Sequence, residues 1–133
     1  MLRLEHIGIA VSDLSISVPL FENLLNSQCY KKEKVESENV TTAFFKAGES
    51  KLELLESSTP EGVIAKFIAK KGEGLHHLAF EVDDIRAEMN RLAAEGFVLL
   101  SDTPKRGADN KLVVFLHPKT SGGVLIELVQ EIR

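Results

Sequence analysis

The chain has 133 residues and a net charge of -4, and 44% of its residues are hydrophobic while 27% are charged. These proportions argue against a disordered chain, and no apolar run reaches the roughly 18 residues of a membrane span. The acidic charge balance argues against nucleic acid as the main partner, because phosphate binding needs a basic face. The single cysteine excludes an internal disulfide, and the first residues lack the features of a signal peptide. We therefore expect a single-domain cytoplasmic protein that neither spans a membrane nor binds nucleic acid.

An internal repeat of about half the chain length organises the sequence. His6–Leu14 aligns without a gap on His77–Ile85 at an offset of 71 residues, and Leu52–Leu55 aligns on Ile126–Val129 at an offset of 74. Such self-similarity indicates a duplicated supersecondary unit. We expect one domain over residues 1–133, made of a first module over about 1–58, a connecting helix over about 59–72 and a second module over about 74–133.

The first module reads as a strand, a helix and three further strands. Apolar residues alternate with small or polar ones over Ile7–Val11, which predicts a half-buried strand with its apolar side under a helix. The helix should begin after a cap at Asp13 and present an apolar stripe over Leu14–Leu25, with Pro19 kinking it or delaying its start. Three short strands are expected over about 27–35, 40–46 and 51–56.

The connecting helix and the second module follow the same logic. Thr59 as cap should begin a short helix that ends at Gly72. A strand over Leu78–Val82 then precedes a helix capped by Asp83 or Asp84. Strands follow over about 97–100, 111–117 and 124–130, and the long loop 101–110 is placed where it can cover a site. The predicted fold is α+β, with the βαβββ module occurring twice.

Four ionisable residues occupy duplicated positions on these strands. Period-two geometry puts His6 and His77 on the sides of their strands that face away from the apolar residues. Glu53 and Glu127 stand between apolar neighbours, where an ionised carboxylate is costly unless a cation or a donor meets it. If the modules pair about a pseudo-twofold axis, all four converge on one point. Two imidazoles and two carboxylates suit a divalent first-row metal ion, and cobalt, manganese, nickel, zinc and iron(II) all remain possible on ligand type.

Other candidate residues have weaker patterns. His76 should point to the opposite face from His77 and is interpreted as structural, and His117 is interpreted as a surface or loop contact. Cys29 is interpreted as a packing residue. The remaining cations are either solvated charges or contacts for an anionic substrate; they are Lys105, Arg106 and Lys119.

The duplicated module with these ligands resembles the vicinal oxygen chelate superfamily, and within it the methylmalonyl-CoA epimerases. The resemblance covers nearly the whole chain and rests on five stretches, which are His6–Val11, Lys51–Glu56, Gly74–Ile85, Phe115–Lys119 and Gly122–Leu128. The first stretch is shared across the superfamily, whereas the double histidine His76-His77 and the last stretches are more specific to the epimerases. The resemblance implies a homodimer and one divalent metal ion per chain, with cobalt favoured. Its ligands would be His6, His77 and Glu127, with Glu53 at a fourth, more variable position.

The reaction that the resemblance implies is interconversion of the 2R and 2S epimers of methylmalonyl-CoA. A proton leaves C2 to give an enolate stabilised by the metal, and one returns on the other face. Glu127 is the first candidate for one acid/base group, and the candidates for the other are Glu53, then Glu36, Glu38 and Glu81. Some family members carry a second catalytic carboxylate on the third strand of the first module, whereas Val40–Phe44 contains no acid. Candidates to meet the substrate carboxylate or the CoA phosphates are Lys105, Arg106, Lys119 and Ser121.

Three other functions share features with this pattern. A glyoxalase I (lactoylglutathione lyase) would act on the glutathione hemithioacetal of methylglyoxal through a similar proton transfer. An iron(II) extradiol dioxygenase would use two histidines and one carboxylate, and would take up oxygen with catechols. A drug-sequestering binding module of the same fold needs no metal ligands, so their duplication counts against it.

Overall fold

The computed structural model describes residues 1–132. The chain divides into two compact units, each built around one copy of the repeat. The first, His6–His76, is called the amino-terminal unit. The second, called the carboxyl-terminal unit, comprises the chain from His77 onward together with Met1–Glu5. The predicted α+β fold with a duplicated βαβββ module is confirmed.

The amino-terminal unit contains the first module and the connecting helix. In order, its elements are β1 (Arg3–Ala10, from His6 onward), α1 (Leu14–Leu25), β2 (Lys31–Val35), β3 (Val40–Ala47), β4 (Ser50–Ser57) and α2 (Val63–Lys71). The strands lie in the order β2-β3-β4-β1. Strand β1 runs parallel to β4, while β3 is antiparallel to both of its neighbours. A short 3-10 turn over Glu36–Glu38 joins β2 to β3.

Helix α1 begins where the sequence predicts, despite its proline. The Asp13 side chain accepts a hydrogen bond from the Ser15 amide at 2.9 Å, and the helix runs from Leu14 through Pro19. The expectation that Pro19 delays the start is therefore wrong. The Asp13 cap fixes the first turn, and burial of Leu14 and Val18 against the sheet outweighs the one helical hydrogen bond that a proline removes.

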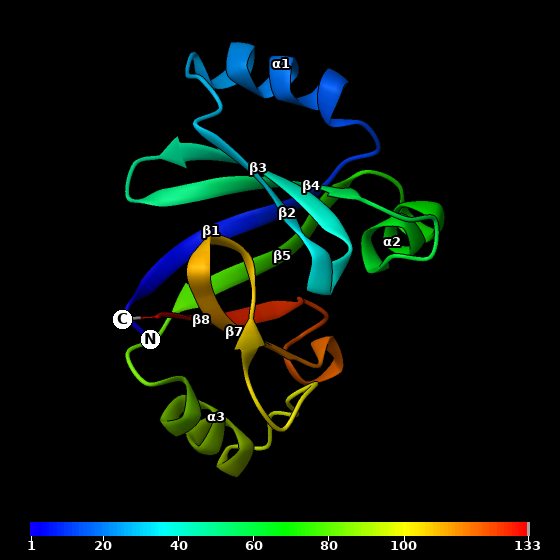
Figure 1. Cartoon of the computed structure of the whole chain (residues 1–133). Coiled ribbons are helices and arrows are strands. Elements are labelled where there is room, and N and C mark those ends of the chain that lie inside the picture. Colours follow the sequence, from blue (N-terminus) through cyan, green and yellow to red (C-terminus); the bar gives the residue numbers. More distant parts are fainter. Residues whose placement is uncertain (133) are drawn as a thin grey trace. The chain divides into compact units, whose positions relative to one another are not determined.

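The core of the amino-terminal unit lies between α1 and one face of the strands. Figure 1 shows α1, in blue, lying across β3 and β4. Residues from the helix and from three strands form this core, which comprises Val11, Leu14, Val18, Ala43, Phe45 and Leu54 with Ile9, Phe21, Leu25, Cys29 and Leu52 packed against it. Because side chains alternate along a strand, His6 and Glu53 lie on the other face.

The connecting helix α2 starts later than predicted. Its N-cap is Gly62 rather than Thr59, and no side chain caps it. The Thr59 carbonyl instead accepts hydrogen bonds from the Gly62 amide at 3.2 Å and from the Ser57 hydroxyl at 2.6 Å, so it belongs to a turn. The predicted end is confirmed, since Gly72 follows the last turn with a φ of 83°, a conformation that favours glycine.

The carboxyl-terminal unit contains the second module. Its elements are β5 (Gly74–Glu81, from His77 onward), α3 (Ile85–Ala94), β6 (Lys105–Arg106), β7 (Lys111–Leu116) and β8 (Ile126–Glu131), with 3-10 turns over Ala108–Asn110 and Pro118–Thr120. The strand order here is β5-β8-β7-β6. Met1–Glu5 lies beside β5, and the Leu2 amide donates to the Glu81 carbonyl at 2.8 Å. Asp84 caps α3 by accepting from the Ala87 amide.

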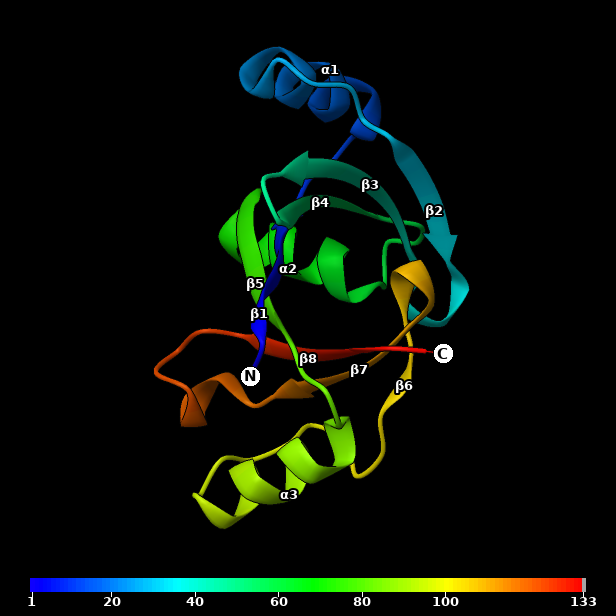
Figure 2. The same ribbon diagram turned by 90° about the vertical axis from the view of Figure 1, so that its left-hand side faces the viewer.

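A second core lies beneath α3. Figure 2 shows α3, in yellow-green, alongside β7 and β8. The buried residues of this core are Val82, Ile85, Met89, Leu92, Val114, Leu116 and Leu128. Each unit therefore has its own hydrophobic core beneath its own helix.

The strand predicted over 97–100 is wrong. Within residues 1–132 this segment forms an isolated bridge between Leu99 and Leu116 instead of a strand, and Phe97 and Leu99 pack against the core under α3. The short outer strand of this module is instead β6, which contains Lys105 and Arg106 and pairs with β7. The segment 101–110 is thus not wholly a loop.

The repeat is confirmed in the strand register. In the parallel pairs, Ile7 lies opposite Leu52 in the first module, and Leu78 lies opposite Ile126 in the second. Within residues 1–132, no helix is both long and apolar enough to cross a membrane.

Candidate functional site

A buried histidine and a buried glutamate meet in the amino-terminal unit. His6 lies on β1 and Glu53 on the adjacent strand β4, and His6 Nδ1 is 3.1 Å from Glu53 Oε2. Both residues are at most 5% exposed. A carboxylate at this depth is costly unless a cation or a donor meets it, so the imidazole is part of what holds Glu53 there.

Lys51 adds a positive charge beside this pair. Its ammonium lies 3.9 Å from Glu53 Oε2 and 5.6 Å from the centre of the fully buried Phe44 ring, a cation–π distance. The sequence pattern does not single out Lys51 as a site residue. The available signal was its position two residues before Glu53, which places both side chains on one face of β4.

The carboxyl-terminal unit contains the equivalent pair. His77 Nε2 is 3.1 Å from Glu127 Oε1, and both side chains are buried. The imidazole packs edge-on against Phe115, with ring centres 5.6 Å apart and planes at 86°. This contact fixes the ring orientation, so the nitrogen that faces Glu127 is held in place.

The two glutamates have matching cross-strand neighbours. Phe44 lies opposite Glu53 on the outer side, and Gly8 lies opposite it on the inner side. Around Glu127 the same places are taken by Phe115 and Ala79. In each unit the glutamate therefore has an aromatic wall on one side and a small residue on the other.

Each pair fits half of a metal site. Imidazole nitrogen and carboxylate oxygen are common ligands of divalent first-row metals, and both bind at about 2.0–2.2 Å. Two such atoms on neighbouring corners of a coordination sphere are about 3 Å apart, close to the 3.1 Å between nitrogen and oxygen in each pair. Burial of all four residues fits ligands that meet an ion away from bulk water.

The strand register places the two basic residues of β6, Lys105 and Arg106, on opposite faces of the sheet. Lys105 lies opposite Val113, which in turn lies opposite Val129. Since Val129 is two residues after Glu127, Lys105 shares the Glu127 face. Arg106 belongs to the opposite face, and its guanidinium donates to Asn110 Oδ1 at 3.2 Å.

The other two substrate-contact candidates lie in the turn between β7 and β8. The Lys119 amide donates to His117 Nδ1 at 3.1 Å, and the Ser121 hydroxyl donates to the Val124 carbonyl at 2.7 Å. His117 is therefore a loop contact, as interpreted from the sequence. The turn leads directly into β8, where Glu127 is the second residue.

The alternative acid/base candidates lie in varied surroundings. Glu36 is exposed in the turn before β3 and pairs with Lys34 at 3.6 Å, and Glu38 is in the same turn. Glu81 pairs with Arg3 at 2.9 Å. His76 contacts Phe67 of α2 edge-on, with ring centres 4.8 Å apart, which fits its interpretation as a structural residue. Cys29 packs against the core under α1, also as interpreted.

Thr42 on β3 is a buried polar residue that is not among the site residues predicted from the sequence. Its side-chain hydroxyl is buried and has no hydrogen-bond partner within residues 1–132. Leaving such a group unsatisfied costs about 1–3 kcal/mol. A threonine in a strand is unremarkable in sequence, so no pattern could have revealed it.

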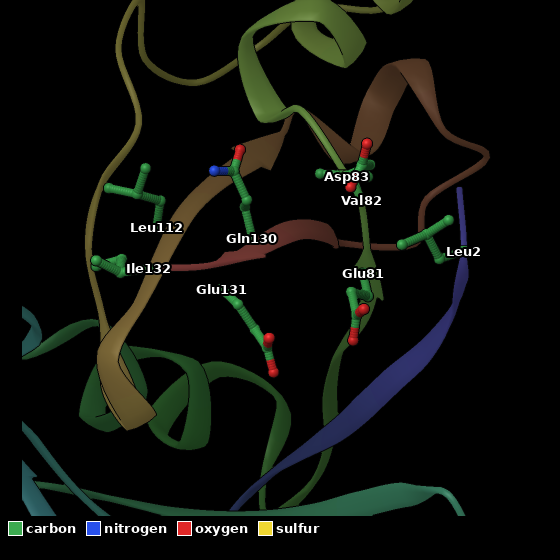
Figure 3. A pocket seen from close by; sticks show the side chains of 8 residues that line it. All are labelled: Leu2, Glu81, Val82, Asp83, Leu112, Gln130, Glu131 and Ile132. Atoms are coloured by element: carbon green, nitrogen blue, oxygen red, sulfur yellow. The ribbon is translucent and has the colours of Figure 1, made fainter.

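A pocket of about 290 Å³ in the carboxyl-terminal unit lies away from the His77–Glu127 pair. Figure 3 shows the side chains that line it, which are Leu2, Glu81, Val82, Asp83, Leu112, Gln130, Glu131 and Ile132. It lies at the carboxyl ends of β5 and β8, and three of the residues that line it are acidic. Such a lining is unsuited to an anionic substrate.

A family sequence model and individual protein sequences indicate the same relatives for this chain. Residues 5–115 match the sequence model of the Glyoxalase/Bleomycin resistance protein/Dioxygenase superfamily. The chain is 40% identical over 129 residues to the mitochondrial methylmalonyl-CoA epimerase of Homo sapiens, covering 96% of this chain and 73% of that protein. It is 39% identical over 130 residues to an ethylmalonyl-CoA/methylmalonyl-CoA epimerase of Cereibacter sphaeroides, covering 96% and 97% respectively.

Solved structures agree with these sequence relatives. A Streptomyces coelicolor methylmalonyl-CoA epimerase variant in complex with 2-nitronate-propionyl-CoA superposes with a TM-score of 0.94 at 36% identity, covering 98% of this chain and 95% of that one. The chain therefore belongs to the Glyoxalase/Bleomycin resistance protein/Dioxygenase superfamily and, within it, to the family of the methylmalonyl-CoA epimerases.

Proposed function

We propose that this protein is a methylmalonyl-CoA epimerase, which interconverts the 2R and 2S epimers of its substrate. The observation that carries the proposal is the duplicated pair of buried histidine and glutamate, His6 with Glu53 and His77 with Glu127. Similarity to epimerases over nearly the whole chain supports the choice of substrate.

The two pairs together are proposed to hold one divalent metal ion, with Co²⁺ favoured and Mn²⁺, Ni²⁺ or Zn²⁺ as alternatives. The ligands would be His6, Glu53, His77 and Glu127. When bound, such an ion supplies Lewis-acid stabilisation of negative charge on substrate oxygens. The nitrogen–oxygen distance of 3.1 Å within each pair supports the assignment of its two residues as ligands of an ion.

The proton transfers are assigned to the glutamates. Glu127 accepts the C2 proton, the C–H bond breaks, and its electron pair moves toward the thioester carbonyl to give an enolate. Glu53, from the other module, enters this step as the carboxylic acid and delivers its proton to the opposite face of C2, which leaves Glu127 protonated and Glu53 ionised. In the other direction Glu53 takes the C2 proton and Glu127 delivers one. Inversion needs one acid/base group near each face, and glutamates at duplicated positions supply two.

The anionic parts of the substrate are proposed to meet basic and polar side chains of the carboxyl-terminal unit. Lys105 is the first candidate because it shares the Glu127 face. Lys119 and Ser121 follow in the turn before β8, and Arg106 is the least favoured because it belongs to the opposite face. Water-excluding contacts around Glu127 come from Phe115 and Ala79.

The sequence also predicts one domain, a homodimer and a cytoplasmic location, and these remain predictions. The proposed function is tested by following pure 2R or 2S methylmalonyl-CoA on a chiral assay with protein supplied with Co²⁺ or Mn²⁺. Conversion toward an equal mixture supports the proposal. Absence of conversion, with turnover of the glutathione hemithioacetal of methylglyoxal, would reassign the protein to lactoylglutathione lyase activity.

A further inference from the structure

Thr42 lies on the face of its sheet that carries Glu53, and not on the face that forms the hydrophobic core under α1. Its neighbours along β3, Ala43 and Phe45, belong to the core under α1, so Thr42 points to the other side. That side contains Phe44 and, opposite it on β4, Glu53. The hydroxyl is thus on the same face as a proposed ligand and acid/base group.

Thr42 is also close to Glu53 within that face. It lies opposite Leu55, which is two residues after Glu53 on β4. Diagonal neighbours of this kind have β-carbons about 7–8 Å apart. A small acyl group placed beside Glu53 can therefore reach the Thr42 hydroxyl through one hydrogen bond.

The second copy of the module shows that packing does not require the hydroxyl. Phe44 opposite Glu53 corresponds to Phe115 opposite Glu127, so Thr42 corresponds to Val113, two residues before Phe115. Val113 is buried in the same way, with an exposure of 3%. Valine has the shape of threonine without its polar atom, so the module accepts the apolar residue at this place.

We infer that the Thr42 hydroxyl donates a hydrogen bond to an oxygen of the bound substrate, which makes Thr42 a substrate-binding residue on the Glu53 side of the site. This inference rests on the proposed function. The malonyl part of the substrate offers carboxylate and thioester oxygens, which only accept hydrogen bonds, and a threonine hydroxyl can donate. The buried hydroxyl has no hydrogen-bond partner within residues 1–132, so no described hydrogen bond must break for it to donate to the substrate.

The test compares Thr42→Val with Thr41→Val, a matched change one residue earlier on the opposite face of β3. For Thr42→Val we expect kcat/KM to fall roughly 10- to 100-fold, the range for a hydrogen bond to a charged oxygen. Its melting temperature without substrate should rise by at least about 3 °C, because the change removes a buried hydroxyl that has no hydrogen-bond partner in the described part of the chain. Thr42→Ser, which retains the hydroxyl, should keep kcat/KM within about fivefold of the wild type, and Thr41→Val should be unchanged within about twofold.

The substrate oxygen that Thr42 contacts is identified by whether the fall in kcat/KM comes from kcat or from KM. A fall in kcat alone indicates an oxygen that gains charge during the reaction, whereas a rise in KM alone indicates the carboxylate, which is charged throughout. Unchanged kcat/KM in Thr42→Val, with an active wild type, would overturn the inference and leave the proposed function standing. A wild type with no epimerase activity would remove both. If Thr42→Val does not fold, loss of activity in Thr42→Ser beyond that of Thr41→Val would likewise overturn it.

Discussion

Glu53 and Glu127 occupy the same position in two copies of one strand pattern. Each lies next to a histidine at 3.1 Å, with a phenylalanine opposite it on the outer strand. The inner neighbour is glycine for Glu53 and alanine for Glu127. This equivalence provides two carboxylates in similar surroundings, which is what a reaction that inverts one carbon needs from its acid/base groups.

Replacing either glutamate by glutamine should abolish most activity. Glu127→Gln and Glu53→Gln retain the side-chain volume but cannot take up a proton, so we expect kcat to fall roughly 10²- to 10⁴-fold in each. The measurement is the initial rate of epimer interconversion. Glu131→Gln, on the same strand as Glu127 but half exposed, is the matched control and should be unaffected. Near-normal rates in Glu127→Gln would contradict its role.

Loss of one glutamate should affect the two substrate epimers differently. If each acts on its own face of C2, Glu127→Gln and Glu53→Gln should differ in residual proton exchange when started from 2R or 2S substrate. The measurement is solvent exchange at C2 for each epimer separately. Identical residual exchange for both epimers in both variants would contradict the assignment of one glutamate to each face.

Removal of divalent metal should reduce both activity and stability. Without an ion, the proposed ligands His6, Glu53, His77 and Glu127, all buried, lose a positive partner. We therefore expect loss of epimerase activity and a lower melting temperature after chelation, both restored by Co²⁺ or Mn²⁺. His77→Asn should remove the metal-dependent gain in melting temperature. A melting temperature that does not respond to chelator or added metal would argue against the site.

Mutation of the two basic residues of β6 should affect KM to different extents. Lys105→Ala is expected to raise KM roughly 5- to 20-fold with little change in kcat, because Lys105 shares the Glu127 face and would meet an anionic part of the substrate. Arg106→Ala, a neighbouring change on the opposite face, should leave KM within about twofold. Equal effects of the two substitutions would show that general charge, and not the face, is responsible.

The ion pair on α3 gives a pH-dependent contribution to stability. The hydrogen bond from Arg91 lowers the pKa of Glu88 below its usual value of 4.5. Its stabilisation is therefore present above about pH 4.5 and is lost as the pH falls through the lowered pKa. Glu88→Gln should reduce the free energy of unfolding at pH 7 by less than about 1 kcal/mol, and this difference should vanish in strong acid. Denaturant unfolding at both pH values measures it.

Much of the fold was predictable because the repeat and the alternation of residues are local signals. The caps at Asp13 and Asp84 and the stop at Gly72 follow from side-chain chemistry, and the structure confirms them. The failures arose where the residue pattern does not determine the hydrogen-bond partners. Phe97 and Leu99 have a strand pattern, but the segment forms an isolated bridge at Leu99. Thr59 resembles a helix cap, but its carbonyl closes a local turn.

The two histidine–glutamate pairs of the candidate site were predictable from the sequence, but their surroundings were not. The pairing of His6 with Glu53 and of His77 with Glu127 follows from duplicated spacing on strands. Which side chains face each other across strands determines the position of the Lys51 ammonium beside Glu53. It also determines that the Thr42 hydroxyl is without a hydrogen-bond partner among residues 1–132. The strand register, which the sequence pattern indicates only roughly, determines those contacts.

Deuterium incorporation at C2 of methylmalonyl-CoA in heavy water tests the central claim most directly. The protein is incubated with substrate, with and without a chelator, and mass spectrometry follows the exchange against a protein-free sample. We predict rapid exchange coupled to interconversion of the epimers, lost with the chelator and restored by Co²⁺ or Mn²⁺. Exchange no faster than in the protein-free sample, with metal present, would contradict the proposed epimerase.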